Sequence, residues 1–87
     1  MFYVYILRTS GNTLYIGQTN DVEKRLKEHR SHSIRASKYV RSFSSVTLVY
    51  QESFLTRNEA MRREAQLKKW PKHKKEALIV EKLNINN

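Results

Sequence analysis

The sequence predicts a single α+β domain, in which helices flank a small three-stranded antiparallel sheet and the elements follow the order ββαβαα. Three observations support this prediction: an apolar, aromatic run followed by turn residues, two segments of helical periodicity that begin at capping residues, and a length of 87 residues, which suits one modest core. We therefore assign residues 1–87 to one domain. A short sheet with helices packed on it is the usual arrangement for this order of elements.

The strands are predicted from apolar runs and turn chemistry. Phe2 to Leu7 is apolar almost throughout, as in a strand that is covered on both faces. The turn residues Ser10-Gly11-Asn12-Thr13 separate it from a second strand at Leu14 to Gly17, which indicates a β-hairpin. Val46 to Phe54 provides the third strand.

The first helix is predicted after this hairpin. Asn20 is the expected N-cap, and Glu23 follows three residues later in capping-box position, so the helix should run from about Asp21 to Arg30. The segment from Ser31 to Ser45 is polar, basic and rich in serine, which is typical of a surface loop.

Two further helices are predicted at the C-terminal end. Thr56 and Glu59 repeat the capping-box pattern and open a helix that should reach about Trp70. Pro71 stops or redirects the chain before a last helix that should continue through Leu83.

The composition favours a polyanionic partner. Seventeen Lys and Arg against eight Asp and Glu give a formal net charge of +9, for which nucleic acid is the first candidate. No apolar run approaches the roughly 20 residues that span a bilayer, and we expect a cytoplasmic protein without a membrane segment. Because the chain has no cysteine, oxygen and imidazole groups would have to hold any metal, which suits a hard cation. Kinase, dehydrogenase and serine-hydrolase motifs are absent.

Glu64 is the first candidate for a chemical role. At about 100° per helical residue, it falls inside an apolar arc formed by Leu67, Ala60, Met61 and Ala65. A carboxylate there must be paired, hydrogen-bonded or bound to a metal, because burying it alone would cost several kcal/mol. On spacing alone, a structural ion pair and a metal ligand are about equally well supported roles for Glu64.

Arg25 and His29 form a second candidate group. They lie four residues apart on one face of the first predicted helix, with His29 beside Val22 and Leu26, so both could point at one bound phosphate. The alternatives are a buried structural histidine and a solvated arginine pair, and the residues alone favour the structural histidine.

Three tyrosines lie on the two hairpin strands. Strand alternation places Tyr3 and Tyr5 on one face and Val4 and Ile6 on the other, and Tyr15 lies on the second strand. Packing is the default explanation for each ring. A phenol could serve as a base only beside a metal or cations that stabilise the phenolate.

Taken together, Tyr3-Val4-Tyr5, the Tyr15-Ile16-Gly17 triplet after a glycine turn, Arg25 and His29 on one helix and Glu64 on a later helix resemble the GIY-YIG endonuclease superfamily. The match covers nearly the whole chain and looks closest to the short stand-alone branch, which is related to the nuclease domains of excision-repair enzymes. The first element lacks the glycine of the family, and Gln18 stands where some members place a lysine.

The resemblance implies a role for each matched residue. Tyr5 and Tyr15 would be the active-site tyrosines, Arg25 would contact the scissile phosphate, and His29 would join the same catalytic site. Glu64 would be the sole protein ligand of one divalent cation, Mg²⁺ or in its place Mn²⁺. The implied reaction is one-metal hydrolysis of a phosphodiester bond, in DNA repair or recombination. Sequence does not choose between Tyr15 and His29 as general base.

Two further residues belong to the expected site as structural parts. Tyr3 starts the tyrosine strand. Gly17 either lets the backbone pass close to a bulky group or leaves the strand with a positive φ.

A basic surface is expected to contact DNA. Its residues come from the C-terminal run and from the serine-rich loop: Lys68, Lys69, Lys72, Lys74 and Lys75, with Arg35, Lys38 and Arg41. Tyr39 is a candidate to stack on a base, whereas Trp70 is expected to belong to the core. We expect a monomer that binds DNA, with RNA left open. The alternative is a non-catalytic nucleic-acid-binding module that keeps the nuclease fold.

Overall fold

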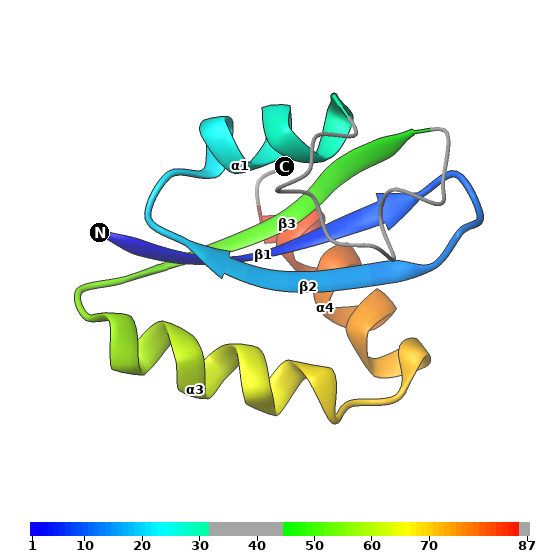
Figure 1. Ribbon diagram of the computed structural model, residues 1–87. Helices are drawn as coiled ribbons and strands as arrows, with labels where there is room; N and C mark the ends of the chain where they lie inside the picture. The colour runs from blue at the N-terminus through cyan, green and yellow to red at the C-terminus, as the bar shows by residue number, and fades with distance from the viewer. Residues whose placement is uncertain (32–44, 86–87) are drawn as a thin grey trace.

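The computed structural model describes residues 1–31 and 45–85 of the chain (Figure 1). Its elements confirm the predicted order ββαβαα. They are β1 (Phe2–Thr9), β2 (Leu14–Thr19), α1 (Val22–Arg30), β3 (Val46–Phe54), α3 (Arg57–Lys68) and α4 (Lys72–Ile85).

The three strands form one antiparallel sheet in the order β2-β1-β3. In the central strand β1, side chains alternate between the two faces as predicted: Val4 and Ile6 join one apolar cluster, and Tyr5 and Leu7 join the other. All four of these residues are buried, which is why this segment is apolar at every position. The register between β1 and β3 shifts between Ile6 and Leu7, where the ladder has an irregularity.

Helices cover both faces of the sheet (Figure 1). Helix α1 lies over the face that carries Tyr5 and Leu7, and its Leu26 packs against that cluster. Helices α3 and α4 lie under the opposite face, where Ala60, Leu67 and Ile79 complete the larger cluster. The sheet therefore separates two apolar layers, and the tyrosine face belongs to the smaller one.

The start of α1 differs from the prediction. The N-cap is Asp21 instead of Asn20, because the Asp21 Oδ1 accepts the backbone N–H of Lys24 at 3.1 Å. Thr19 fixes this choice, since its hydroxyl accepts the backbone N–H of Asp21 at 3.1 Å and holds the residue in an extended conformation. The expected capping box between Asn20 and Glu23 is therefore wrong.

The cap of α3 agrees with the prediction. The Thr56 Oγ1 accepts the backbone N–H of Glu59 at 3.2 Å, and the same hydroxyl donates to the Glu59 side chain at 2.9 Å. The helix ends at Lys68, and α4 begins directly after Pro71 and continues to Ile85, two residues past the expected end.

The apolar arc predicted for α3 is narrower than expected. Ala60 and Leu67 are fully buried, but Met61 is 49 % exposed and Ala65 is exposed as well. On the opposite flank of the buried stripe lies Arg63, whose guanidinium makes two hydrogen bonds of 2.9 Å to the carboxylate of Glu52 on β3. The buried stripe is thus bounded by a paired arginine on the side of Leu67, and the side that carries Met61 and Ala65 is open to solvent.

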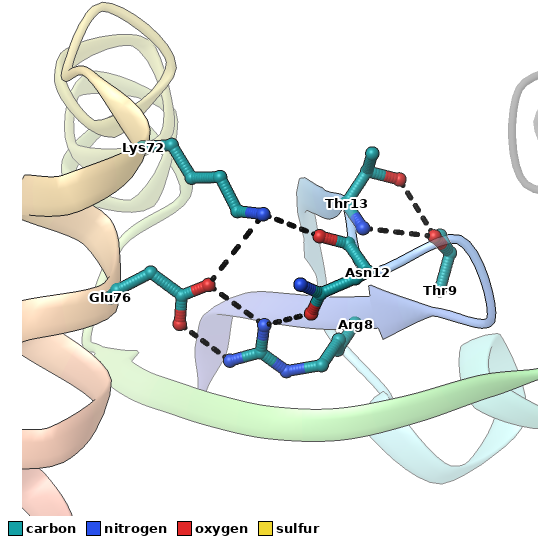
Figure 2. Close-up of polar contacts among 6 residues, drawn as sticks. All are labelled: Arg8, Thr9, Asn12, Thr13, Lys72 and Glu76. Atoms are coloured by element: carbon teal, nitrogen blue, oxygen red, sulfur yellow. Dashed lines mark hydrogen bonds and ion pairs between the residues drawn. The ribbon is translucent and has the colours of Figure 1, made fainter.

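A polar network ties α4 to the hairpin turn (Figure 2). The guanidinium of Arg8 donates to both carboxylate oxygens of Glu76, at 2.8 and 2.5 Å, and to the Asn12 Oδ1 at 2.9 Å. The ammonium of Lys72 donates to the backbone carbonyl of Asn12 at 2.6 Å. These groups are partly exposed, so each pair contributes at most about 1 kcal/mol, but together they fix where α4 begins.

Within residues 1–31 and 45–85, none of the helices is long and apolar enough to cross a bilayer.

Candidate active site

Tyr5, Tyr15 and His29 meet on the α1 face of the sheet. Tyr15 lies opposite Leu7 in the β1–β2 register, which places it on the same face as Tyr5. The ring of His29 lies 6.2 Å from that of Tyr5 and 5.4 Å from that of Tyr15, measured between centroids. The Tyr5 hydroxyl and the His29 Nε2 are 3.2 Å apart, within hydrogen-bonding distance.

His29 is a neutral, buried histidine. Its residue is only 1 % exposed, and burial together with the charge of Arg25 lowers the pKa of His29 to about 4. The Nδ1 atom is buried and has no hydrogen-bond partner among the described residues. His29 thus faces the tyrosines and carries no charge near neutral pH.

The low pKa of His29 makes the stability of the fold depend on pH. The unfolded chain takes up a proton near pH 6.5, whereas the folded protein does so only near pH 4, so the unfolded state binds more protons between these values. We expect the free energy of unfolding to fall by roughly 3 kcal/mol as the pH drops through this window. Denaturant unfolding at a series of pH values measures the slope.

The matched variants are His29→Gln, which removes the titrating ring, and His73→Gln, which removes an exposed histidine on α4. The slope above pH 5 should flatten only in His29→Gln. The carboxylates of Glu52 and Glu76 have pKa values lowered below 4.5, so they lose their stabilising pairs in a more acidic range. An unchanged slope in His29→Gln would contradict the assignment.

Arg25 brings a positive charge to this cluster. Its side chain is 24 % exposed and lies 3.6 Å from the carboxylate of Glu28. Burial opposes the charge of the guanidinium, but hydrogen bonds to Tyr5 and Tyr15 outweigh this effect, and the pKa of Arg25 is raised. The guanidinium is therefore held beside both phenols and keeps part of its surface open to solvent.

Tyr5 keeps its proton. Burial raises the pKa of Tyr5 to about 12, and the negative charge of Glu64 adds to this increase, while the hydrogen bond with Arg25 acts in the opposite direction. At neutral pH the Tyr5 hydroxyl is consequently a hydrogen-bond donor.

Gly17 makes room for the ring of Tyr5. The two residues are directly opposite in the register, and a Cβ atom at position 17 would lie 2.6 Å from the Tyr5 Cζ. The φ of Gly17 is not positive, so of the two expected reasons for this glycine the close approach is the correct one. Any side chain there would force the Tyr5 ring to move.

Glu64 lies in the other helical layer, within electrostatic range of Tyr5. It lies on α3, which packs against β1 and β2, and its carboxylate is 22 % exposed. The Glu64 Oε2 lies 3.2 Å from the Nζ of Lys68, one turn later on the same helix. The negative charge of Glu64 raises the pKa of Tyr5, so the two side chains interact electrostatically. The ion pair of Glu64 with Lys68 is partly exposed to solvent.

The donor set around Glu64 suits one kind of metal. Within the described part of the chain, no three His, Asp or Glu side chains gather as they would in a site built wholly from protein ligands. Mg²⁺ usually keeps several waters and is held by one or two carboxylates together with phosphate oxygens. A single half-buried carboxylate that would share the cation with phosphate oxygens and water fits that pattern.

The basic residues of the C-terminal run have mixed surroundings. Lys68 pairs with Glu64, Lys72 binds the hairpin turn, and the Lys74 ammonium lies 4.3 Å from the ring centroid of Trp70. Trp70 packs against the larger core cluster, as predicted. Lys69 is exposed and Lys75 is half-buried, whereas Arg35, Lys38, Tyr39 and Arg41 lie outside the described residues.

Tyr3 is half-buried on the same face as Tyr5, near the start of α1. It lines an open cleft of about 530 Å³ together with Val22, Leu26 and Leu48. Tyr3 therefore borders the tyrosine cluster without joining the contacts between Tyr5, Tyr15 and His29.

Comparisons with known proteins agree with this arrangement. Residues 1–77 match the GIY-YIG catalytic domain. A UPF0213 protein of Bacillus pumilus is 41% identical over 83 residues, covering 95% of this chain and 82% of that protein, and a UPF0213 protein of Haloquadratum walsbyi is 42% identical over 84 residues, covering 97% and 92%.

A solved structure supports the fold independently. The solution NMR structure of a UPF0213 protein from Bacillus halodurans is similar with a TM-score of 0.61 and 38% sequence identity, covering 94% of this chain and 86% of that one. Since the family match extends over most of the chain and relatives of similar length align nearly end to end, this protein belongs to the GIY-YIG family of nuclease catalytic domains.

Proposed function

We propose that this protein is an endonuclease that depends on a divalent cation and hydrolyses phosphodiester bonds in DNA, with a role in repair or recombination. The observation that carries the proposal is the convergence of Arg25 with Tyr5 and Tyr15 on one face of the sheet, within the electrostatic reach of Glu64. Such a set combines a cation for a phosphate, two phenols for hydrogen bonding and a carboxylate for a metal.

Arg25 would bind the scissile phosphate. Its guanidinium is fixed by the two phenols and stays charged, so it can donate two parallel hydrogen bonds to phosphate oxygens as negative charge gathers in the transition state. Glu64 would hold Mg²⁺, or Mn²⁺ in its place, and the cation would supply Lewis-acid stabilisation of that same charge.

Tyr15, in preference to His29, would be the residue that contacts the attacking water. His29 is almost wholly buried, whereas Tyr15 is only half-buried and forms a hydrogen bond with the cationic Arg25, so a water molecule can reach Tyr15 more easily. Tyr15 would orient or deprotonate the water, Tyr5, which is as buried as His29, would hold the Arg25 guanidinium in place, and His29 would position Tyr5. Water adds to phosphorus, the bond to the 3′ oxygen breaks, and that oxygen takes a proton from solvent.

The test is a cleavage assay on end-labelled linear and branched DNA, with matched RNA strands alongside. We expect cleavage with MgCl₂ or MnCl₂ and none in EDTA. Binding that is sensitive to salt but independent of metal, with intact substrate under every metal condition, would contradict the proposal and indicate a non-catalytic nucleic-acid-binding module.

A further inference from the structure

A polar recess lies where β2 ends and α3 begins. It has a volume of about 220 Å³ and is lined by Phe2, Gln18, Thr19, Asn20 and Arg57. Gln18 is opposite Val4 in the sheet register, so its side chain belongs to the α3 face. In Figure 1 the end of β2 and the first turn of α3 lie at the same end of the sheet.

The lining of this recess is rich in donors and contains no carboxylate. The hydroxyl of Thr19 is engaged by the backbone of Asp21, which leaves the amides of Gln18 and Asn20 and the guanidinium of Arg57 to meet a ligand. Amide and guanidinium donors without an acidic neighbour suit an anion that carries several oxygen acceptors.

Arg57 differs from the arginines that hold the fold together. Arg8 pairs with Glu76 and Arg63 with Glu52. Across residues 1–31 and 45–85, no carboxylate lies within ion-pair distance of Arg57, and its side chain is exposed. The positive charge of Arg57 is thus available to a ligand at the recess.

Arg57, which lines the recess, lies on the same side of α3 as Glu64. Arg57 and Glu64 are seven residues apart on α3, which is about two helical turns, so they lie on the same side of the helix and about 10 Å apart along its axis. One strand of B-DNA advances about 3.4 Å along the axis for each phosphate. In a complex whose DNA axis runs along α3, a strand with its scissile phosphate near Glu64 would therefore present another phosphate to Arg57 about three nucleotides away.

We infer that Arg57, with the amides of Gln18 and Asn20, binds a backbone phosphate of the strand that is cut. The ligand class, a phosphodiester, follows from the recess itself, whereas its distance from the cut rests on the proposed function. Arg57 is a substrate-positioning residue that the sequence pattern did not single out, although its spacing of two turns from Glu64 is the signal that identifies it.

The inference is tested by binding of a fluorescent DNA duplex in EDTA, measured by anisotropy over a series of salt concentrations. Arg57→Ala should weaken binding about 5- to 10-fold and reduce the slope of log Kd against log salt concentration by about 1. Gln18→Glu, which places a carboxylate in the recess, should weaken binding at least as much. The matched control is Arg62→Ala, which removes an exposed arginine on a different side of α3 and should change Kd less than twofold.

Equal effects of Arg57→Ala and Arg62→Ala, in proteins with unchanged thermal unfolding, would overturn the inference. Because binding is measured without metal, this outcome is independent of catalysis. If no variant or metal condition gives cleavage but Arg57→Ala still binds more weakly than Arg62→Ala, the phosphate site stands and the nuclease proposal fails.

Discussion

Replacing Glu64 with glutamine is expected to lower the metal-dependent cleavage rate by about a thousandfold, which corresponds to about 4 kcal/mol of transition-state stabilisation. The substitution keeps the size of the side chain and removes the only charge proposed to hold the cation. Glu64 is partly exposed and pairs with Lys68 on the same helix, so the fold should persist. Single-turnover cleavage at saturating protein isolates the chemical step.

Glu81→Gln is the matched control, because it removes an exposed carboxylate on α4 that belongs to neither the tyrosine cluster nor the recess at Arg57. A direct measurement of Mn²⁺ binding should show weaker binding only in Glu64→Gln. Full cleavage activity in a folded Glu64→Gln protein would exclude this carboxylate as the metal ligand and would remove the basis of the one-metal proposal.

Replacing Arg25 with alanine is expected to lower the cleavage rate by about 10² to 10³-fold, since a preorganised donor to developing charge contributes about 3 to 4 kcal/mol in enzymes of this kind. The loss should fall mainly on the rate constant of the chemical step, because the electrostatic attraction of the rest of the basic surface still binds DNA. Arg25→Lys should recover only part of the activity, because an ammonium keeps the charge but cannot reproduce two parallel hydrogen bonds.

Arg30→Ala provides the comparison on the same helix, since Arg30 is exposed at the end of α1. Circular dichroism of both variants checks that α1 is intact. A similar loss of rate in Arg25→Ala and Arg30→Ala would mean that Arg25 contributes only general charge, and its proposed contact with the scissile phosphate would have to be abandoned.

The elements of the fold were predictable because their signals are local. The limits of the third strand, Val46 to Phe54, follow from a continuous β-forming segment, and the structure has the same limits. At the start of α1 two adjacent residues, Asn20 and Asp21, can both act as caps, and sequence chose the wrong one. The hydrogen bond from Asp21 to Thr19 decides between them, and it depends on where the hairpin strand ends.

The buried face of α3 was predicted less well, because it too depends on a contact with another element. Helical periodicity places Met61 on the apolar arc, yet the structure exposes it and buries part of Arg63. The pairing of Arg63 with Glu52, eleven positions earlier on β3, offsets the cost of bringing a charge to the core edge. Periodicity within one helix carries no information on a partner in another element.

By itself the sequence determined the order of elements and the two faces of β1, because alternation and capping act over a few positions, and the candidate site residues followed from the resemblance to the GIY-YIG family. Only the tertiary structure decided that Tyr5 meets His29, that Gly17 makes room for the Tyr5 ring and that Arg25 is held between two phenols. These contacts join residues up to 24 positions apart. They depend on the strand register and on how α1 packs over the sheet, and both are set by burial of the whole core.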